Sequence, residues 1–233
     1  MQERLKPIYL FSDSQLLFWE EKGKLFLNSV RKEINKKAPT AAYIGASNSD
    51  DPAFYEIFKA AMGCIGIQDC YMIHSDFRED DRQNLKAADV ILLAGGDVNV
   101  GWNVFSETDL KETVLQKYYD GGLIIGISAG AIQLGRGWMD KSNDSKLLST
   151  FSIVPMVIGV HEERQEWSDL KKVLQMAGSN FRAIGIPTGG GLLYYPDHSV
   201  EPLRHPVKEF SLENDTFAIN VLLPPNSNGK YKN

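Results

Sequence analysis

The pentapeptide Gly126-Ile127-Ser128-Ala129-Gly130 is the stretch whose residue types most directly suggest chemistry. It fits G-x-S-x-G, the pattern of a strand-to-helix turn that holds a serine hydroxyl above a sheet. An apolar run begins at Leu123, and residues 131–134 continue as a buried helix would. Amides at such a junction can stabilise a developing oxyanion. The pattern predicts that Ser128 is a nucleophile, with a plain helix N-cap serine as the alternative.

A serine hydroxyl needs a base within hydrogen-bond reach before it can attack a carbonyl. His161 is the best candidate, because it ends the apolar segment 157–160 and would emerge at a sheet edge. A carboxylate must then orient the imidazole. Asp144 lies between the serine and the histidine in the chain and is the preferred acid. Glu162 and Glu163 are alternatives that stand too close to His161 in sequence to fold back easily.

The three other histidines are expected to have structural or solvated roles. His74 sits at the end of a buried run, while His198 and His205 lie in a polar, proline-containing stretch.

These residues resemble the peptidase E and cyanophycinase family of serine peptidases. The resemblance runs from the first predicted strand to about Tyr195. It is carried by five segments: residues 126–131, similar to the family's G-x-S-A-G-A elbow; Ala94-Gly95-Gly96-Asp97, similar to its Gly-Gly-Asn loop; Asn143-Asp144; Val160-His161, where the family has Pro-His; and Gly185-Ile186-Pro187, similar to its Gly-Leu-Pro-Glu-Gly segment.

The resemblance implies a class I glutamine amidotransferase-like (flavodoxin-like) fold, with serine where the amidotransferases carry cysteine. It also implies that Ser128 attacks the carbonyl, His161 moves the proton and Asp144 orients the histidine. The amides of Gly96 and Ala129 would then form the oxyanion hole. No metal or organic cofactor is required by this chemistry.

Two positions depart from the family pattern. Asp97 stands where the family has asparagine, and Thr188 stands where it has glutamate. Both are expected to contact the substrate. Because the family loop holds the substrate's aspartyl group, a carboxylate at Asp97 would repel it. We therefore expect neutral or cationic N-terminal residues to be preferred over aspartyl ones.

The leading hypothesis is a serine hydrolase that cleaves a peptide or related amide bond, with a small peptide as its substrate. A dipeptidase is favoured over a hydrolase of the aspartate-arginine polymer cyanophycin. The departures at Asp97 and Thr188 motivate a second hypothesis, a binding or regulatory protein with a decayed site. An ordinary α/β-hydrolase esterase is disfavoured, because its histidine should lie near the C-terminus, where only His198 and His205 could serve.

The elements that must position these residues follow from alternating apolar and amphipathic stretches. Strands are expected at 8–11, 41–45, 71–74, 90–94 and 123–127, and helices at 16–34, from Asp51-Pro52, from Asp80-Asp81 and at 110–119. Buried strands separated by helices predict an α/β three-layer sandwich with a mainly parallel central sheet. After about residue 145 the alternation weakens, with strands expected at 183–186, 192–195 and 217–223. One domain over 1–233 is expected, with 223–233 as a frayed tail.

Composition excludes several classes of protein. The 233 residues carry 25 Lys and Arg against 30 Asp and Glu, a net charge of −5, so no basic field favours nucleic acid or anionic lipid. Cys64 and Cys70 cannot form a disulfide framework and predict semi-buried thiols in a reducing compartment. Neither a signal segment nor a run of ~18 apolar residues is found, so a cytoplasmic protein without membrane partners is expected, as a monomer or homodimer.

Overall fold

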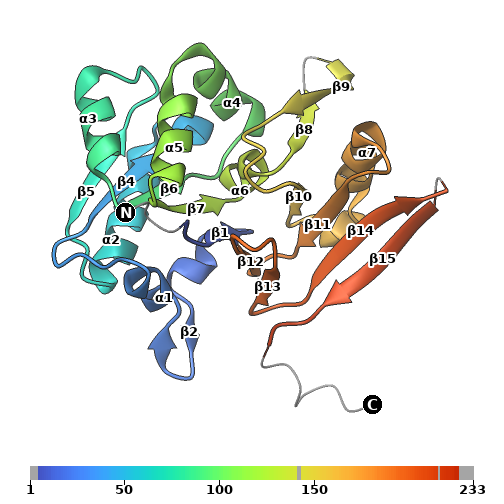
Figure 1. The fold of residues 1–233 in the computed structure, drawn as a ribbon, viewed down its shortest axis with the longest axis horizontal. Helices are drawn as coiled ribbons and strands as arrows, with labels where there is room; N and C mark the ends of the chain where they lie inside the picture. The colour runs from blue at the N-terminus through green and yellow to red at the C-terminus, as the bar shows by residue number, and fades with distance from the viewer. Residues whose placement is uncertain (1–4, 141–142, 215, 226–233) are drawn as a thin grey trace.

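A mostly parallel sheet of seven strands forms the centre of the protein (Figure 1). The computed structural model describes residues 5–140, 143–214 and 216–225, without the side chains of 143–145. Strands β1, β4, β5, β6 and β7 run parallel, and β12 and β13 pair antiparallel at one edge. Their order is β13 (Val200–Leu203), β12 (Gly191–Tyr194), β1 (Ile8–Phe11), β7 (Leu123–Ile127), β6 (Val90–Leu93), β4 (Thr40–Ile44) and β5 (Asp69–Ile73).

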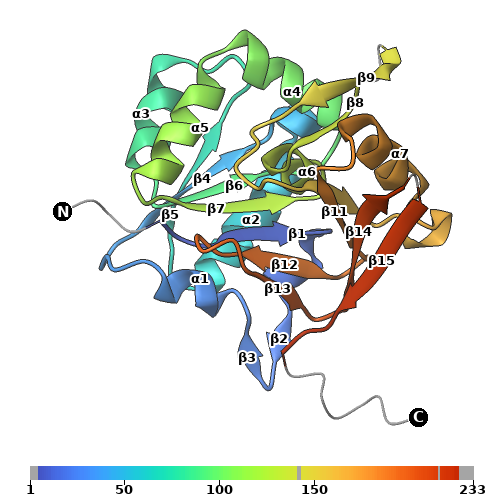
Figure 2. The same ribbon diagram turned by 45° about the vertical axis from the view of Figure 1, so that its right-hand side comes forward.

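Helices cover both faces of this sheet, which confirms the three-layer α/β prediction (Figure 2). Successive strand residues point to opposite faces. Leu10 therefore packs in one apolar cluster, and its neighbours Tyr9 and Phe11 pack in the other. One face is covered by α1 (Asn28–Lys32) and α2 (Pro52–Cys64); the other is covered by α3 (Glu79–Ala87), α4 (Val98–Glu107), α5 (Leu110–Tyr119) and α6 (Ala129–Leu134).

The local signals that predicted α2 act as expected. The Asp51 carboxylate accepts a hydrogen bond from the Ala53 amide at 2.9 Å, and Pro52 occupies the first turn. Helix α5 covers the predicted residues 110–119, and α3 begins one residue before Asp80.

The long helix predicted over 16–34 is wrong. The segment contains the short 3-10 helix η1 (Ser14–Leu17), a hairpin of β2 (Glu20–Glu21) and β3 (Lys24–Leu25), and α1. Lys22 and Gly23 between the strands have φ values of 52° and 72°. Two consecutive residues with positive φ make the tight turn that joins hairpin strands, and such a turn interrupts a helix.

A second sheet has four strands, two of which precede β12 and β13 of the central sheet in the chain and two of which follow them. Its order is β10 (Val157–Val160), β11 (Arg182–Ile186), β14 (Val207–Glu213) and β15 (Thr216–Leu222), and α7 (Ser168–Ala177) packs against it. The strands expected at 183–186, 192–195 and 217–223 are confirmed as β11, β12 and β15. The sequence interpretation missed the hairpin of β8 (Gly137–Asp140) and β9 (Asn143–Ser149), as well as β13 and β14. Residues 226–233 of the expected tail lie outside the described residues.

Two further sequence expectations concern the cysteines and membrane spans. Both thiols are free; Cys64 is exposed rather than semi-buried, and burial raises the pKa of the half-buried Cys70 to about 11. No helix within the described ranges combines the length and the apolar character needed to cross a membrane.

Candidate active site

Ser128 occupies a strained turn between β7 and α6. Its φ of 50° and ψ of −112° lie outside the regions that non-glycine residues ordinarily adopt, a strain of order 1–3 kcal/mol that is typical of functional sites. The flanking glycines allow the turn to pack. A Cβ at Gly130 would lie 2.2 Å from the Leu93 carbonyl oxygen, and one at Gly126 would lie 2.7 Å from the Gly130 oxygen.

The Ser128 hydroxyl meets the His161 ring. The distance from Ser128 Oγ to His161 Nε2 is 3.0 Å, although the two residues are 33 positions apart in the chain. In the tautomer that carries its proton on Nδ1, the imidazole accepts the serine proton at Nε2. The structure thus brings the predicted nucleophile and base together.

His161 is held by the second sheet rather than by the first. It directly follows β10, which runs parallel to β11 with Val160 opposite Ile186. The His161 amide donates a hydrogen bond to the Ile186 carbonyl at 3.0 Å, and the residue takes a positive φ of 45°. The ring therefore reaches Ser128 from a strand end, as the apolar run before it predicted.

The loop after β6 passes directly beside the elbow. A Cβ at Gly95 would lie 3.1 Å from Ser128 Cβ, and one at Gly96 would lie 2.0 Å from the Ser47 carbonyl oxygen. Gly96 also has a φ of 139°, which favours glycine. Within the described ranges, no hydrogen bond engages the Gly96 or Ala129 amide, so both donors are available to an oxyanion.

A buried glutamine fixes the segments around this loop. Gln133 is fully buried, and its Nε2 donates to the Val98 carbonyl at 3.0 Å and to Ser47 Oγ at 3.1 Å. The Asp97 amide donates to the Ser47 carbonyl at 2.7 Å. These bonds connect α6, α4 and the short helix η2 (Ala46–Asn48). Sequence reasoning missed Gln133. A glutamine in an otherwise apolar helix after the elbow would have indicated a buried side chain that needs hydrogen-bond partners.

Asp97 caps helix α4. Its carboxylate accepts hydrogen bonds from the amides of Asn99 at 2.8 Å and Val100 at 3.2 Å. Its expected role in substrate binding therefore remains a prediction, and any effect on substrate must act from this capping position.

Thr188 meets a carboxylate that sequence reasoning had set aside. Its amide lies 3.3 Å from each carboxylate oxygen of Glu163, in the 3-10 helix η3 (Glu163–Gln165). Burial raises the pKa of Glu163, but hydrogen bonds from Thr188 and the nearby His161 outweigh burial, so this pKa lies below its usual value. A carboxylate, that of Glu163, therefore lies next to the backbone of Thr188, the position at which the family pattern has glutamate. The proposed contact of Thr188 with substrate stays a prediction.

Glu162 and Asp144 are the other two acids that the sequence offered as partners of His161. Burial raises the pKa of Glu162 to about 7, although its carboxylate accepts a hydrogen bond from the Leu170 amide at 3.2 Å. Asp144 lies in β9, which pairs with β8 in a hairpin that extends away from the central sheet in Figures 1 and 2. The Asp144 side chain is outside the described part of the structure. Its assignment as the orienting acid therefore remains a prediction.

Among the described residues, none of the other three histidines forms a hydrogen bond with Ser128 Oγ. His74 Nδ1 is 3.1 Å from the Asp81 carboxylate, and His198 Nδ1 bonds the Tyr194 hydroxyl. Burial and the neighbouring Arg204 lower the pKa of His205, while Asp13 and Glu163 oppose that shift.

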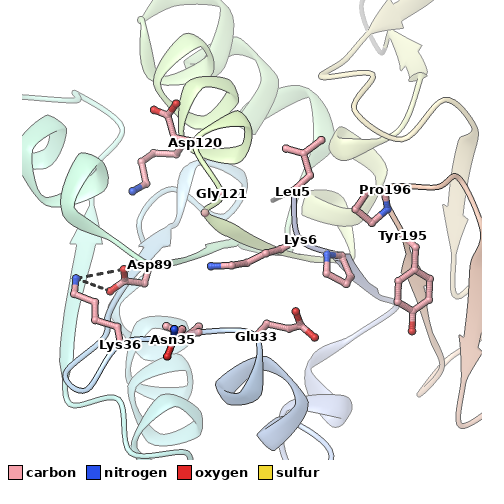
Figure 3. A pocket seen from close by; sticks show the side chains of 14 residues that line it. Leu5, Lys6, Glu33, Asn35, Lys36, Asp89, Asp120, Gly121, Tyr195 and Pro196 are labelled. Atoms are coloured by element: carbon pink, nitrogen blue, oxygen red, sulfur yellow. Dashed lines mark hydrogen bonds and ion pairs between the residues drawn. The ribbon is translucent and has the colours of Figure 1, made fainter. Parts of the chain in front are cut away.

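A cavity of about 700 Å³ lies at the amino ends of the parallel strands, at the other end of these strands from Ser128 (Figure 3). Pro7, Asp89 and Gly122, which line it, directly precede β1, β6 and β7. The Lys36 ammonium bonds the Asp89 carboxylate there at 2.9 Å. Ser128 and Gly96 instead follow the carboxyl ends of β7 and β6, where ligands bind in parallel α/β sheets.

Comparison with known proteins agrees with this geometry. The chain is similar to a crystal structure of a peptidase from an acI-B1 Actinobacterium, with 14% identity, 97% of each chain covered and a TM-score of 0.71. It is also similar to a putative peptidase E protein from Listeria monocytogenes EGD-e, with 16% identity, 87% of this chain and 100% of that chain covered and a TM-score of 0.63. At these identities the likeness shows the fold. No match was found among curated proteins.

The sequence model of peptidase family S51 matches residues 9–197. This range contains the elbow, the glycine loop after β6 and His161. The chain therefore belongs to peptidase family S51 and is a serine-type peptidase.

Proposed function

We propose that this protein is a dipeptidase-like enzyme that hydrolyses a small peptide through Ser128 and His161. The observation that carries the proposal is the 3.0 Å approach of Ser128 Oγ to His161 Nε2 at a strained strand-to-helix turn. A nucleophile within reach of its base is the geometry that covalent acyl transfer requires.

In the first half of the reaction, Ser128 Oγ attacks the scissile carbonyl carbon while His161 Nε2 takes the hydroxyl proton. The carbonyl oxygen becomes an oxyanion, and in this proposal it accepts hydrogen bonds from the amides of Gly96 and Ala129. Each such donor typically contributes about 2.7–4 kcal/mol to the transition state. The intermediate then collapses, His161 returns its proton to the leaving amine, and an acyl-serine ester remains.

In the second half, a water molecule attacks the ester and gives its proton to His161. The second tetrahedral intermediate expels Ser128 Oγ, which regains the proton from the imidazole, and the carboxylic acid product leaves. The residues named here supply every proton movement in this sequence.

A carboxylate that orients His161 completes the proposed mechanism. Asp144 has this role in the Ser-His-Asp arrangement that the family resemblance implies. Glu163 is a second candidate, favoured by its bonds to the Thr188 amide and its electrostatic effect next to His161. Either acid would stabilise the imidazolium that forms in each step.

A fluorophosphonate probe tests the proposal, because it labels only an activated serine. We expect labelling of the wild-type protein and none of Ser128→Ala or His161→Ala, with thermal transitions retained in both variants. Mass spectrometry should place the adduct on Ser128. Hydrolysis of a dipeptide library can be followed by detecting the newly formed amino groups. This activity should be absent from the same two variants.

Silence of the folded wild-type protein toward both probe and peptides would contradict the proposal. It would favour the alternative of a binding or regulatory protein with a decayed site. Release of dipeptides from cyanophycin, without cleavage of free dipeptides, would instead assign the cyanophycinase-like activity.

A further inference from the structure

A second cavity, of about 270 Å³, opens directly beside the nucleophile. Ser128, Gly95 and Gly96 line one side of it, so it adjoins the place where the scissile carbonyl would be held. Pockets for drug-sized ligands usually have volumes of ~300–1,000 Å³. A cavity below that range, next to the reacting atoms, suits a single substrate side chain.

Much of the remaining lining of this cavity is apolar. Helix α2 contributes Phe54, Ile57 and Phe58, whose spacing places them on one helix face. Phe54 is 50% exposed and Ile57 is 38% exposed, whereas Phe58 is buried. Leu17 of η1 also contributes to this apolar lining. Two large apolar side chains facing water beside a nucleophile form a surface that an apolar substrate group would cover favourably.

The charges around the cavity disfavour an acidic side chain. Asp13 is the one ionised side chain that the described lining provides, and no Lys, Arg or His lines it. Its carboxylate accepts hydrogen bonds from the Gly189 amide at 2.6 Å and the Gln15 amide at 2.9 Å, which hold it in place. Tyr43 stays neutral, because burial raises its pKa to about 12. An acidic substrate side chain would meet the like charge of Asp13 and no cationic side chain in the described lining.

We propose that this cavity binds an uncharged, apolar side chain, such as that of leucine, methionine or phenylalanine, on the substrate residue that carries the scissile carbonyl. That residue's Cα is bonded to the carbon that Ser128 attacks, and its carbonyl oxygen points to Gly96. Its side chain is therefore the substrate group nearest to the cavity. This inference rests on the proposed peptidase function and names the substrate class that the site takes.

The kcat/KM values of a matched dipeptide series test the pocket. Leu-Ala and Phe-Ala should be hydrolysed about 10- to 200-fold better than Ala-Ala, the range expected when a hydrophobic pocket binds extra methylenes. Asp-Ala should fall below Ala-Ala. The reversed peptide Ala-Leu should show no gain over Ala-Ala, because its leucine lies on the leaving-group side.

Variants on α2 connect the selectivity to the cavity wall. Phe54→Ala should lower the Leu-Ala to Ala-Ala ratio about tenfold, which is the loss of roughly 1.4 kcal/mol of discrimination. Ile57→Arg should raise the Asp-Ala to Leu-Ala ratio, because it adds a cation to the cavity lining. Tyr119→Ala is the matched control: it removes an aromatic side chain that is 57% exposed on α5, outside the cavity lining, and should leave every ratio unchanged.

A wild-type preference for Asp-Ala, or a selectivity that Phe54→Ala leaves intact, would overturn the pocket assignment. Calorimetric binding of Leu-Ala and Asp-Ala to Ser128→Ala separates this failure from failure of the proposed function. Tighter binding of Leu-Ala without turnover by the wild-type protein would contradict the peptidase function and support the pocket. Equal binding of the two peptides, with turnover present, would contradict only the pocket.

Discussion

Adding a single methyl group at Gly96 should disable the enzyme without changing any catalytic side chain. The new Cβ would lie 2.0 Å from the Ser47 carbonyl oxygen and 2.5 Å from its carbonyl carbon, and both atoms belong to the backbone. The loop must therefore move, which breaks the hydrogen bond from the Asp97 amide to the Ser47 oxygen. The φ of 139° adds backbone strain in any residue with a side chain.

The expected loss in kcat follows from displacement of the Gly96 amide, one of the two proposed oxyanion-hole donors. Loss of one oxyanion-hole donor lowers kcat about 10²- to 10³-fold, equal to about 2.7–4 kcal/mol. The strained backbone costs a further ~1–3 kcal/mol of folding stability. We expect Gly96→Ala to lower kcat by at least about 100-fold with a smaller change in KM, because the oxyanion contact strengthens in the transition state.

Two other glycines supply a graded control. A Cβ at Gly63, in α2, meets nothing within 4 Å, so Gly63→Ala should keep full activity and gain about 0.5–1 kcal/mol of stability. At Gly95 the closest contact is 3.1 Å, to Ser128 Cβ, and an intermediate loss is expected. Initial rates would be normalised by fluorophosphonate titration, and melting temperatures measured in parallel. A folded Gly96→Ala protein with kcat within about twofold of wild type would refute the oxyanion assignment.

Three further predictions follow from contacts in and around the site. Gln133→Leu leaves the Ser47 hydroxyl and the Val98 carbonyl without their buried donor and should lower the unfolding free energy by about 2–4 kcal/mol in urea titrations; an unchanged midpoint would contradict this. Asp144→Asn should lower kcat by about 10²–10⁴-fold and Glu163→Gln about tenfold; the opposite order assigns the orienting role to Glu163. The pKa of Glu162 is raised in the folded protein to about 7, so the folded state binds the extra proton and stability falls as pH rises from about 4.5 to about 7. Glu162→Gln should therefore raise the melting temperature at pH 8 but not near pH 4, and equal gains at both would argue against that shift.

The elbow and the buried strands could be predicted from the sequence because their signals are local. Continuous apolar runs such as 90–94 and 123–127 favour strands covered on both faces, whichever neighbours they acquire. Gly126 and Gly130 mark a turn too tight for side chains. Asp51 and Pro52 start a helix by bonds made within one turn.

Local signals failed where tertiary contacts decide the conformation. The amphipathic pattern over 16–34 suited a helix, but the positive φ values of Lys22 and Gly23 turn the chain into a hairpin. Helix α4 was missed because β-branched residues and Gly101 weaken its propensity. It forms with an Asp97 cap, and Gly101 packs so closely that a Cβ there would lie 2.2 Å from Ser47 Oγ.

The sequence by itself determined the class of fold and indicated the candidate nucleophile and base, because a glycine-flanked serine after a buried strand needs no distant partner to form its turn. Only the tertiary structure decided that His161 reaches Ser128 from a second sheet and that Glu163 meets Thr188. It also decided that Phe54, Ile57 and Ser128 line the same cavity. These relations depend on how strands and helices distant in the chain pack together, and residue types alone do not specify that packing.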